Sequence, residues 1–254
     1  MIRLSVNVNK VATLRNSRGG RVPSVTEAVD VCVAARAPGI TVHPRADRRH
    51  ITPEDVREIA ERIRPHRPRV ELNIEGDPRA DLLELVDEVV PDQCTLVPVV
   101  PGEITSQAGW TAEAARDLPP VIDRIKRRGT RVSVFVDPEL AAIRLAADVG
   151  ADRVELYTEP FARAFERDPD RGRSALVRYV AAAQLAHELG LGVNAGHDLD
   201  LANLVLFREL PHLDEVSIGH ALISRALFVG LRTVVSEYLA VLAGAGSPAA
   251  APTE

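Results

Sequence analysis

The chain has 254 residues, of which 46% are hydrophobic and 26% are charged, as in ordinary globular proteins. A chain of this length can form one large α/β barrel without division into two domains. The net charge of −5 argues against a nucleic-acid-binding protein, so any anion site must be a local basic cluster. No run of about 18 apolar residues is present, and no membrane span is therefore predicted.

The N-terminus and the two cysteines indicate a cytoplasmic protein. A strand-like segment, residues 2–8, begins at once, without the charged region and cleavage site of a signal peptide. Cys32 and Cys94 stand among apolar residues and are expected to be buried thiols, with a disulfide or a metal site as the alternative. Residues 1–243 are expected to form one domain, and the low-complexity tail, 244–254, is expected to be disordered.

Eight short apolar segments recur along the chain and predict buried parallel strands. They occupy residues 3–8, 39–43, 69–75, 93–99, 131–137, 153–158, 192–197 and 215–220. Helical segments separate them, which predicts a closed (β/α)₈ TIM barrel with additional helices. The alternative is an open, doubly wound sheet, but no glycine-rich dinucleotide fingerprint follows the first strand.

The segments between the strands carry helix start signals. Ser24 and Glu27 have the spacing of a capping box. Thr52, Asp77 and Asp137 each precede a proline, as a cap residue precedes the first helical position. These three residues are therefore predicted to cap the helices that follow them.

Helix ends are predicted at three glycines with the spacing of left-handed caps, namely Gly129, Gly150 and Gly190. Two helical segments, 170–189 and 221–242, are longer than a barrel requires. The segment 111–118 is predicted to be a short extra helix.

Active sites of such barrels lie at the carboxyl ends of the strands. Three of the seven histidines end predicted strands, and a fourth, His50, lies in the loop after the second. Polar residues at these ends are Asn7, Asn9, His43, Glu75, Asp137, Glu155, Thr158, His197 and His220. This concentration is the main functional signal that the residues carry by themselves.

Three of these side chains suit proton transfer. His43 is expected to be a general acid or base, although a hydrogen bond to backbone is the alternative. Glu75 is expected to have a raised pKa in an apolar barrel mouth. Glu155 alternates with apolar residues and is expected to face the barrel interior, with a buried structural salt bridge as the alternative. Asp137 is interpreted as a helix cap and left out of the site.

Two Gly-His pairs, Gly196-His197 and Gly219-His220, end the last two predicted strands before helices. Backbone amides next to a helix N-terminus bind anions, and barrels often bind phosphate at this place. Arginines in the loops after the first two strands are candidates for a second anion clamp, with solvated loop charges as the alternative: Arg15, Arg18, Arg45, Arg48 and Arg49. The residues alone thus predict an enzyme for phosphorylated substrates that uses His and Glu for proton transfer.

Several segments resemble the family of pyridoxine 5′-phosphate synthase. They are residues 7–19 (NVNKVATLRNSRG), 39–51 (GITVHPRADRRHI), 72–75 (LNIE), 95–98 (TLVP), 193–197 (VNAGH) and 218–220 (IGH). The resemblance extends over residues 3–240. It implies a (β/α)₈ barrel with extra helices that assembles as a homo-octamer.

The resemblance also implies the reaction. 3-Amino-2-oxopropyl phosphate condenses with 1-deoxy-D-xylulose 5-phosphate to give pyridoxine 5′-phosphate, inorganic phosphate and water, without a metal or an organic cofactor. By position, His43 and Glu75 match proton acceptors, His197 matches a proton donor, and Glu155 matches a residue that stabilises the transition state. Contacts to the aminoketone phosphate match Asn7, Arg18, Asp198, Gly219 and His220. Contacts to the deoxyxylulose phosphate match Asn9, Lys10, Arg45, His50 and Thr105.

The chain departs from this family at two places. Asn9-Lys10 stands where many members have Asp-His, and Asp198 stands where a glycine donates its amide to phosphate. A carboxylate beside phosphate is unfavourable, so Asp198 is predicted to turn away and cap the next helix.

Two other functions fit the same residues. One is a metal-dependent sugar-phosphate isomerase or aldolase, in which the ligands would come from His43, Glu75, Glu155, His197 and His220. The other is a barrel that binds phosphorylated ligands without catalysis. The complete set of His43, Glu75 and His197 argues against the second alternative.

Overall fold

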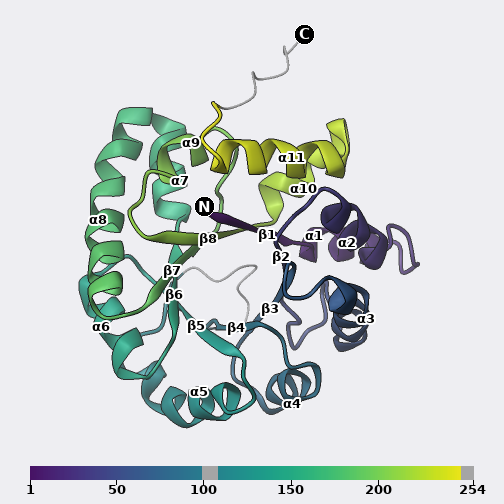
Figure 1. Ribbon diagram of the computed structural model, residues 1–254, viewed down its shortest axis with the longest axis horizontal. Helices are drawn as coiled ribbons and strands as arrows, with labels where there is room; N and C mark the ends of the chain where they lie inside the picture. The colour runs from purple at the N-terminus through teal and green to yellow at the C-terminus, as the bar shows by residue number, and fades with distance from the viewer. Residues whose placement is uncertain (99–107, 247–254) are drawn as a thin grey trace.

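The computed structural model describes residues 1–98 and 108–246, and its eight strands form one closed parallel barrel in which β8 pairs with β1. Figure 1 shows the helices arranged around these strands. The strands are β1 (Arg3–Asn7), β2 (Gly39–Val42), β3 (Glu71–Gly76), β4 (Gln93–Leu96), β5 (Arg131–Val136), β6 (Arg153–Tyr157), β7 (Gly192–Gly196) and β8 (Leu213–Ile218). The predicted barrel is confirmed, and the open sheet is wrong.

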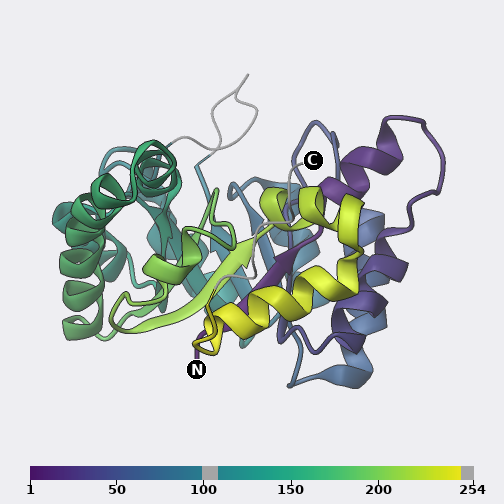
Figure 2. The same ribbon diagram turned by 90° about the horizontal axis from the view of Figure 1, so that it is seen from above.

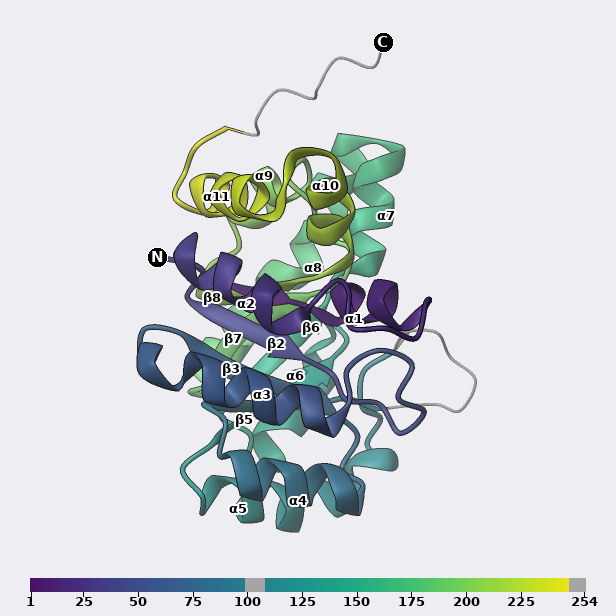
Figure 3. The same cartoon turned by 90° about the vertical axis from the view of Figure 1, so that its right-hand side faces the viewer.

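The helices follow the strands in alternation, with extra elements after β1, β2, β4, β6 and β8. They are α1 (Asn9–Asn16), α2 (Val25–Ala34), α3 (Pro53–Ile63), α4 (Ala80–Val89), α5 (Leu118–Lys126), α6 (Leu140–Asp148), α7 (Glu159–Arg167), α8 (Pro169–Glu188), α9 (Leu204–Phe207), α10 (His220–Val229) and α11 (Leu231–Leu242), with 3₁₀ turns η1 (Arg64–His66) and η2 (Ala114–Asp117). The last helix, α11, packs against α2 and β1, beside the N-terminus (Figure 2, Figure 3). Within the described residues, no helix combines the length and apolar composition that crossing a membrane requires.

Two of the predicted helix starts are correct. The Ser24 hydroxyl accepts the Glu27 amide, and Thr52 forms a reciprocal capping box with Asp55 at the start of α3. The predicted caps at Asp77 and Asp137 are wrong.

The helices after Asp77 and Asp137 begin later than predicted, at Ala80 and Leu140. The Asp77 carboxylate instead pairs with Arg79 at 2.6 Å, and Asp137 accepts the Gly109 amide at 3.1 Å. In both cases a partner outside the first helical turn satisfies the carboxylate.

Glycines end helices as predicted. Gly129, Gly150 and Gly190 have φ angles of +84°, +85° and +77°. The long segment 221–242 is not one helix, because Gly230, with φ +85°, separates α10 from α11. The predicted short helix is confirmed as η2. Of the predicted tail, residues 247–254 lie outside the described residues.

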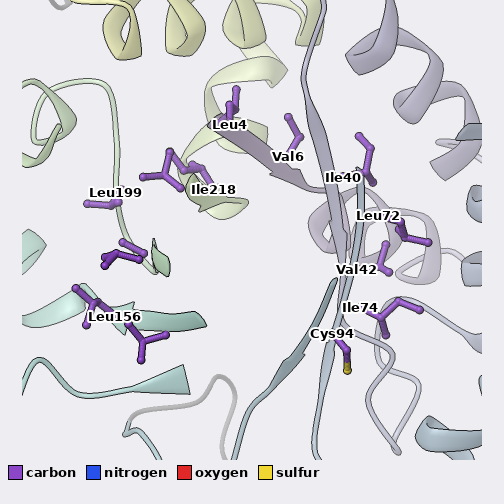
Figure 4. Packing of buried hydrophobic residues seen from close by; sticks show 14 of the residues in the cluster. Leu4, Val6, Ile40, Val42, Leu72, Ile74, Cys94, Leu156, Leu199 and Ile218 are labelled. Atoms are coloured by element: carbon purple, nitrogen blue, oxygen red, sulfur yellow. The ribbon is translucent and has the colours of Figure 1, made fainter. Parts of the chain in front are cut away.

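Alternate residues of the strands face two different environments. Leu4, Val6 and Ile40 are fully buried between the strands and the surrounding helices (Figure 4). Their neighbours face the barrel interior, where Ser5 and Thr41 hydroxyls lie 2.6 Å apart. The interior is thus polar and hydrogen-bonded, while the apolar core between sheet and helices supplies the burial that stabilises the fold.

Candidate active site

A cavity of about 460 Å³ lies at the carboxyl ends of the strands. Twelve of the fourteen predicted site residues line it: Asn7, Asn9, Lys10, His43, Arg45, His50, Glu75, Glu155, His197, Asp198, Gly219 and His220. Arg18 does not, since it lies exposed in the turn after α1. Thr105 lies outside the described residues. The barrel therefore brings together side chains that are far apart in the sequence.

His43 and Glu75 face each other at the ends of β2 and β3. Nδ1 of His43 lies 3.9 Å from Oε2 of Glu75, and each residue is only 8% exposed. Burial, followed by nearby His50 and Arg45, lowers the pKa of His43 well below its usual value. Burial and the Glu155 carboxyl raise the pKa of Glu75 well above its usual value. The lowered pKa keeps the His43 imidazole neutral and able to accept a proton, and the raised pKa of Glu75 favours the protonated carboxyl, which can give one.

Glu155 lies in β6 and faces the cavity rather than a cation. Burial, followed by Glu215, raises its pKa to about 8. Among residues 1–98 and 108–246 it forms no ion pair, and its Oε2 atom has no hydrogen-bond partner. The alternative of a buried structural salt bridge is therefore wrong, and the carboxyl is available to the cavity.

His197 follows β7 with a left-handed backbone, φ +85°. Its ring packs against Phe135, with centroids 5.5 Å apart, and against Tyr157, at 5.3 Å. Burial is the largest influence on its pKa and lowers it, although Asp198 acts in the opposite direction. The two aromatic residues are not predicted from the sequence, where they appear only as apolar members of strands β5 and β6.

His50 is held in one tautomer by its own loop. Its Nδ1 atom accepts the Ile51 amide at 2.9 Å, so the ring proton belongs on Nε2. Burial, followed by Arg45, lowers the pKa of His50 to about 4. The residue is therefore a neutral hydrogen-bond donor at neutral pH, and its ring centroid lies 6.2 Å from that of His43.

The two asparagines after β1 support the reacting groups. Oδ1 of Asn9 accepts the backbone amide of His43 at 2.9 Å, and Oδ1 of Asn7 accepts the Asn9 amide at 3.1 Å. Nδ2 of Asn7 lies 3.5 Å from Oε2 of Glu75. Both residues thus bridge strand ends, a role that their assignment as substrate contacts does not include.

The prediction that Asp198 caps the next helix is wrong. Asp198 is exposed and lines the cavity, with φ +57°. Asp200 instead accepts the amides of Ala202 and Asn203 at 2.9 and 2.8 Å. Asp200 lies at the Asx-turn spacing from these amides, and Asp198 is two residues too early in the chain.

Of the five loop arginines proposed for an anion clamp, two line the cavity and three do not. Arg45 is buried and lines the cavity. Arg49 is exposed at the cavity and pairs with Asp47 through Nε at 2.7 Å. Arg15 binds Asp55 with both terminal nitrogens and joins α1 to α3, so it is not part of an anion clamp. Arg18 and Arg48 are exposed.

Other residues that line the cavity are not predicted from the sequence, and Ser217 is the most informative. Its hydroxyl lies 3.5 Å from Oε1 of Glu75. The signal that could have found it is its alternation with Glu215 on the inner face of β8. Among the described residues, no three His, Cys, Asp or Glu side chains are arranged to hold a metal ion.

Comparison with known proteins identifies the family of the chain. A model of the family "Pyridoxal phosphate biosynthesis protein PdxJ" matches residues 4–244. The pyridoxine 5'-phosphate synthases of Christiangramia forsetii and Bacteroides fragilis are each 51% identical, over 245 and 240 residues, which cover 95% and 94% of this chain and 100% and 98% of theirs. That of Leptospira biflexa is 47% identical over 253 residues, 95% of this chain and 97% of its own.

Solved structures show the same fold at low sequence identity. Phosphoribosyl anthranilate isomerase from Thermus thermophilus has a TM-score of 0.60 at 17% identity and covers 95% of this chain and 98% of its own. Thiamine phosphate pyrophosphorylase from Pyrococcus furiosus has a TM-score of 0.61 at 12% identity and covers 95% and 96%. These likenesses concern the barrel, whereas the family match and the close relatives cover nearly the whole sequence. The chain belongs to the pyridoxal phosphate biosynthesis protein PdxJ family.

Proposed function

We propose that the protein is a pyridoxine 5′-phosphate synthase, a ring-closing transferase of vitamin B6 synthesis. It condenses 3-amino-2-oxopropyl phosphate with 1-deoxy-D-xylulose 5-phosphate and releases pyridoxine 5′-phosphate, inorganic phosphate and water. The observation that carries the proposal is the convergence of His43, Glu75, Glu155 and His197 on one cavity in a chain of this family.

The proton-transfer roles follow from the charge states of these groups. The amine and the ketone form an imine, phosphate leaves, and the ring closes with loss of water, so protons must be removed from carbon and delivered to oxygen. Neutral His43 is suited to accept a proton. Burial raises the pKa of Glu75 and raises that of Glu155 to about 8, and both shifts favour protonated carboxyl groups that can give a proton. His197, on the opposite wall, is assigned the proton delivery to the leaving groups.

The two phosphates are assigned to separate parts of the cavity. The aminoketone phosphate would bind where α10 begins, beside Gly219 and His220, because free amides at a helix N-terminus attract anions. A β-carbon on Gly219 would lie 3.1 Å from Asn7, so the glycine permits this close backbone approach. Asp198 and Arg18 belong to the same predicted set of contacts to the aminoketone phosphate. The negative charge of Asp198 opposes the binding of phosphate there.

The deoxyxylulose phosphate would bind at the loop after β2. Arg45 supplies a buried cation there, and His50 supplies a neutral Nε2–H donor. Asn9, Lys10 and Thr105 complete the predicted set. Lys10 adds a second positive charge at the exposed rim of the cavity.

The assembly and the location in the cell are also proposed. The protein works in the cytoplasm as a homo-octamer, with residues 1–243 as one domain. Leu227 and Phe228 at the end of α10 support assembly, since they are 67% and 88% exposed. Light scattering of the purified protein measures the oligomeric state directly.

The deciding experiment supplies both substrates to the purified protein and detects pyridoxine 5′-phosphate by mass and absorbance. Folded protein that forms no product would contradict the synthase assignment. Glu75→Gln is expected to retain substrate binding but lose turnover by roughly 100-fold or more. A chelator tests the metal-dependent alternative, which requires that turnover be lost with the metal.

A further inference from the structure

Thr158 stands directly after β6 and is completely buried. Its Oγ1 atom lies 2.5 Å from the carbonyl oxygen of Gly196 and also within hydrogen-bonding distance of the carbonyl oxygen of His197. Its backbone amide donates to the same Gly196 carbonyl at 3.0 Å. The residue after β6 thus contacts the carbonyl groups of the last residue of β7 and of the residue that follows it.

The hydroxyl of Thr158 does not cap the helix that follows it. Thr158 is the residue before α7, and threonine at such a position usually accepts an amide of the first helical turn. In this protein its side chain makes no such bond. The hydroxyl proton is directed across to β7 instead, so its partners are the backbone groups of the Gly-His segment.

The backbone that receives this hydrogen bond is in a disfavoured conformation. His197 and Asp198 are consecutive residues with φ angles of +85° and +57°, in the left-handed region that residues other than glycine rarely occupy. Such conformations persist only where surrounding contacts hold them. The hydroxyl of Thr158 restrains the peptide plane between these two residues, and this plane sets the direction in which the His197 side chain leaves the backbone.

We propose that Thr158 is a positioning residue for His197. Its hydroxyl holds the carbonyl groups of Gly196 and His197, and through them keeps the imidazole packed against Phe135 and Tyr157, facing the cavity. A hydroxyl carries a single proton, so the two carbonyls share one donor. The kinetic part of the proposal rests on the proposed synthase function, and the geometric part does not.

The test compares Thr158→Val, which removes the hydroxyl at nearly constant shape, with Thr158→Ser, which keeps it. Thr158→Val is expected to lower kcat by about 10- to 100-fold, because a displacement of about 1 Å in a reacting group has effects of this size. KM for both substrates should change by less than about twofold, since the hydroxyl does not line the cavity. Thr158→Ser should restore most of kcat.

Thr130→Val is the matched control. Thr130 is also buried, and its hydroxyl also donates to a backbone carbonyl, that of Pro91 at 2.8 Å, but it lies before β5 and does not line the cavity. It should lose stability to a similar degree with kcat unchanged. If Thr158→Val does not fold, Thr158→Ala replaces it in the same comparison.

Crystal structures of the wild type and Thr158→Val separate this proposal from the synthase assignment. Movement of the His197 ring in the variant supports the positioning role of Thr158. Failure of the wild type to make pyridoxine 5′-phosphate would overturn only the proposed function. An unmoved ring, or a kcat equal to that of the wild type, overturns the positioning role. So does a Thr158→Ser variant as impaired as Thr158→Val, because the methyl group and not the hydroxyl would then matter.

Discussion

A β-carbon on Gly196 would lie 2.6 Å from Oε1 of Glu155, closer than such atoms approach in proteins. The two residues lie on the adjacent strands β6 and β7. The glycine of the first Gly-His pair therefore has a reason beyond anion binding. It leaves the space that a buried carboxyl of the site occupies.

Gly196→Ala is predicted to displace the Glu155 carboxyl. We expect a loss of about 1–3 kcal/mol in the free energy of unfolding, as for other overpacked sites, and a decrease in kcat of about tenfold or more. Gly20→Ala is the control, because a β-carbon there meets nothing within 4 Å. Urea unfolding and turnover measure both effects, and equal behaviour of the two variants would refute the steric account.

Glu155 is predicted to make stability fall as pH rises. Its pKa of about 8 in the folded protein exceeds the usual value of 4.5, so between these pH values the folded state holds more protons than the unfolded state. Raising the pH through this window should cost on the order of a few kcal/mol of unfolding free energy. Glu155→Gln should flatten the decline in urea titrations at several pH values. An unchanged slope would show that the carboxyl is ionised in the folded protein.

His50 is predicted to have the opposite effect in acid. Its folded pKa of about 4 lies below the usual 6.5, so the folded state holds fewer protons between these values and stability should rise with pH. His50→Gln should reduce this rise, by on the order of 1 kcal/mol for a mostly buried group. Unfolding experiments between pH 4 and 6.5 provide the measurement, and an identical rise in the variant would contradict the assigned charge state.

Asn9 is predicted to act through His43 as well as on substrate. Its Oδ1 atom accepts the His43 amide, an interaction that aspartate at the same position can keep and alanine cannot. We expect Asn9→Ala to lower kcat more than Asn9→Asp does. A variant Asn9→Ala with normal kcat and only a raised KM for the deoxyxylulose phosphate would make Asn9 a substrate contact alone.

Local patterns in the sequence were sufficient to predict the strands and several helix ends. Runs of apolar residues predict buried parallel strands, and the glycines at 129, 150 and 190 end helices because they adopt positive φ angles. The cap predictions at Asp77 and Asp137 were wrong because a nearby guanidinium or amide competes for each carboxylate. The cap prediction at Asp198 was wrong because Asp200 lies nearer the amides.

The sequence by itself determined the barrel and the identity of most groups that line its cavity, because alternation within strands and polar residues at strand ends are local properties. Only the tertiary structure decided the charge states and the supporting contacts. Burial and the approach of Glu155 to Glu75 depend on strands that are distant in sequence. The same holds for the hydrogen bond of Asn9 to His43, the space beside Gly196 and the contact of Thr158 with the end of β7, which exist only once the barrel closes.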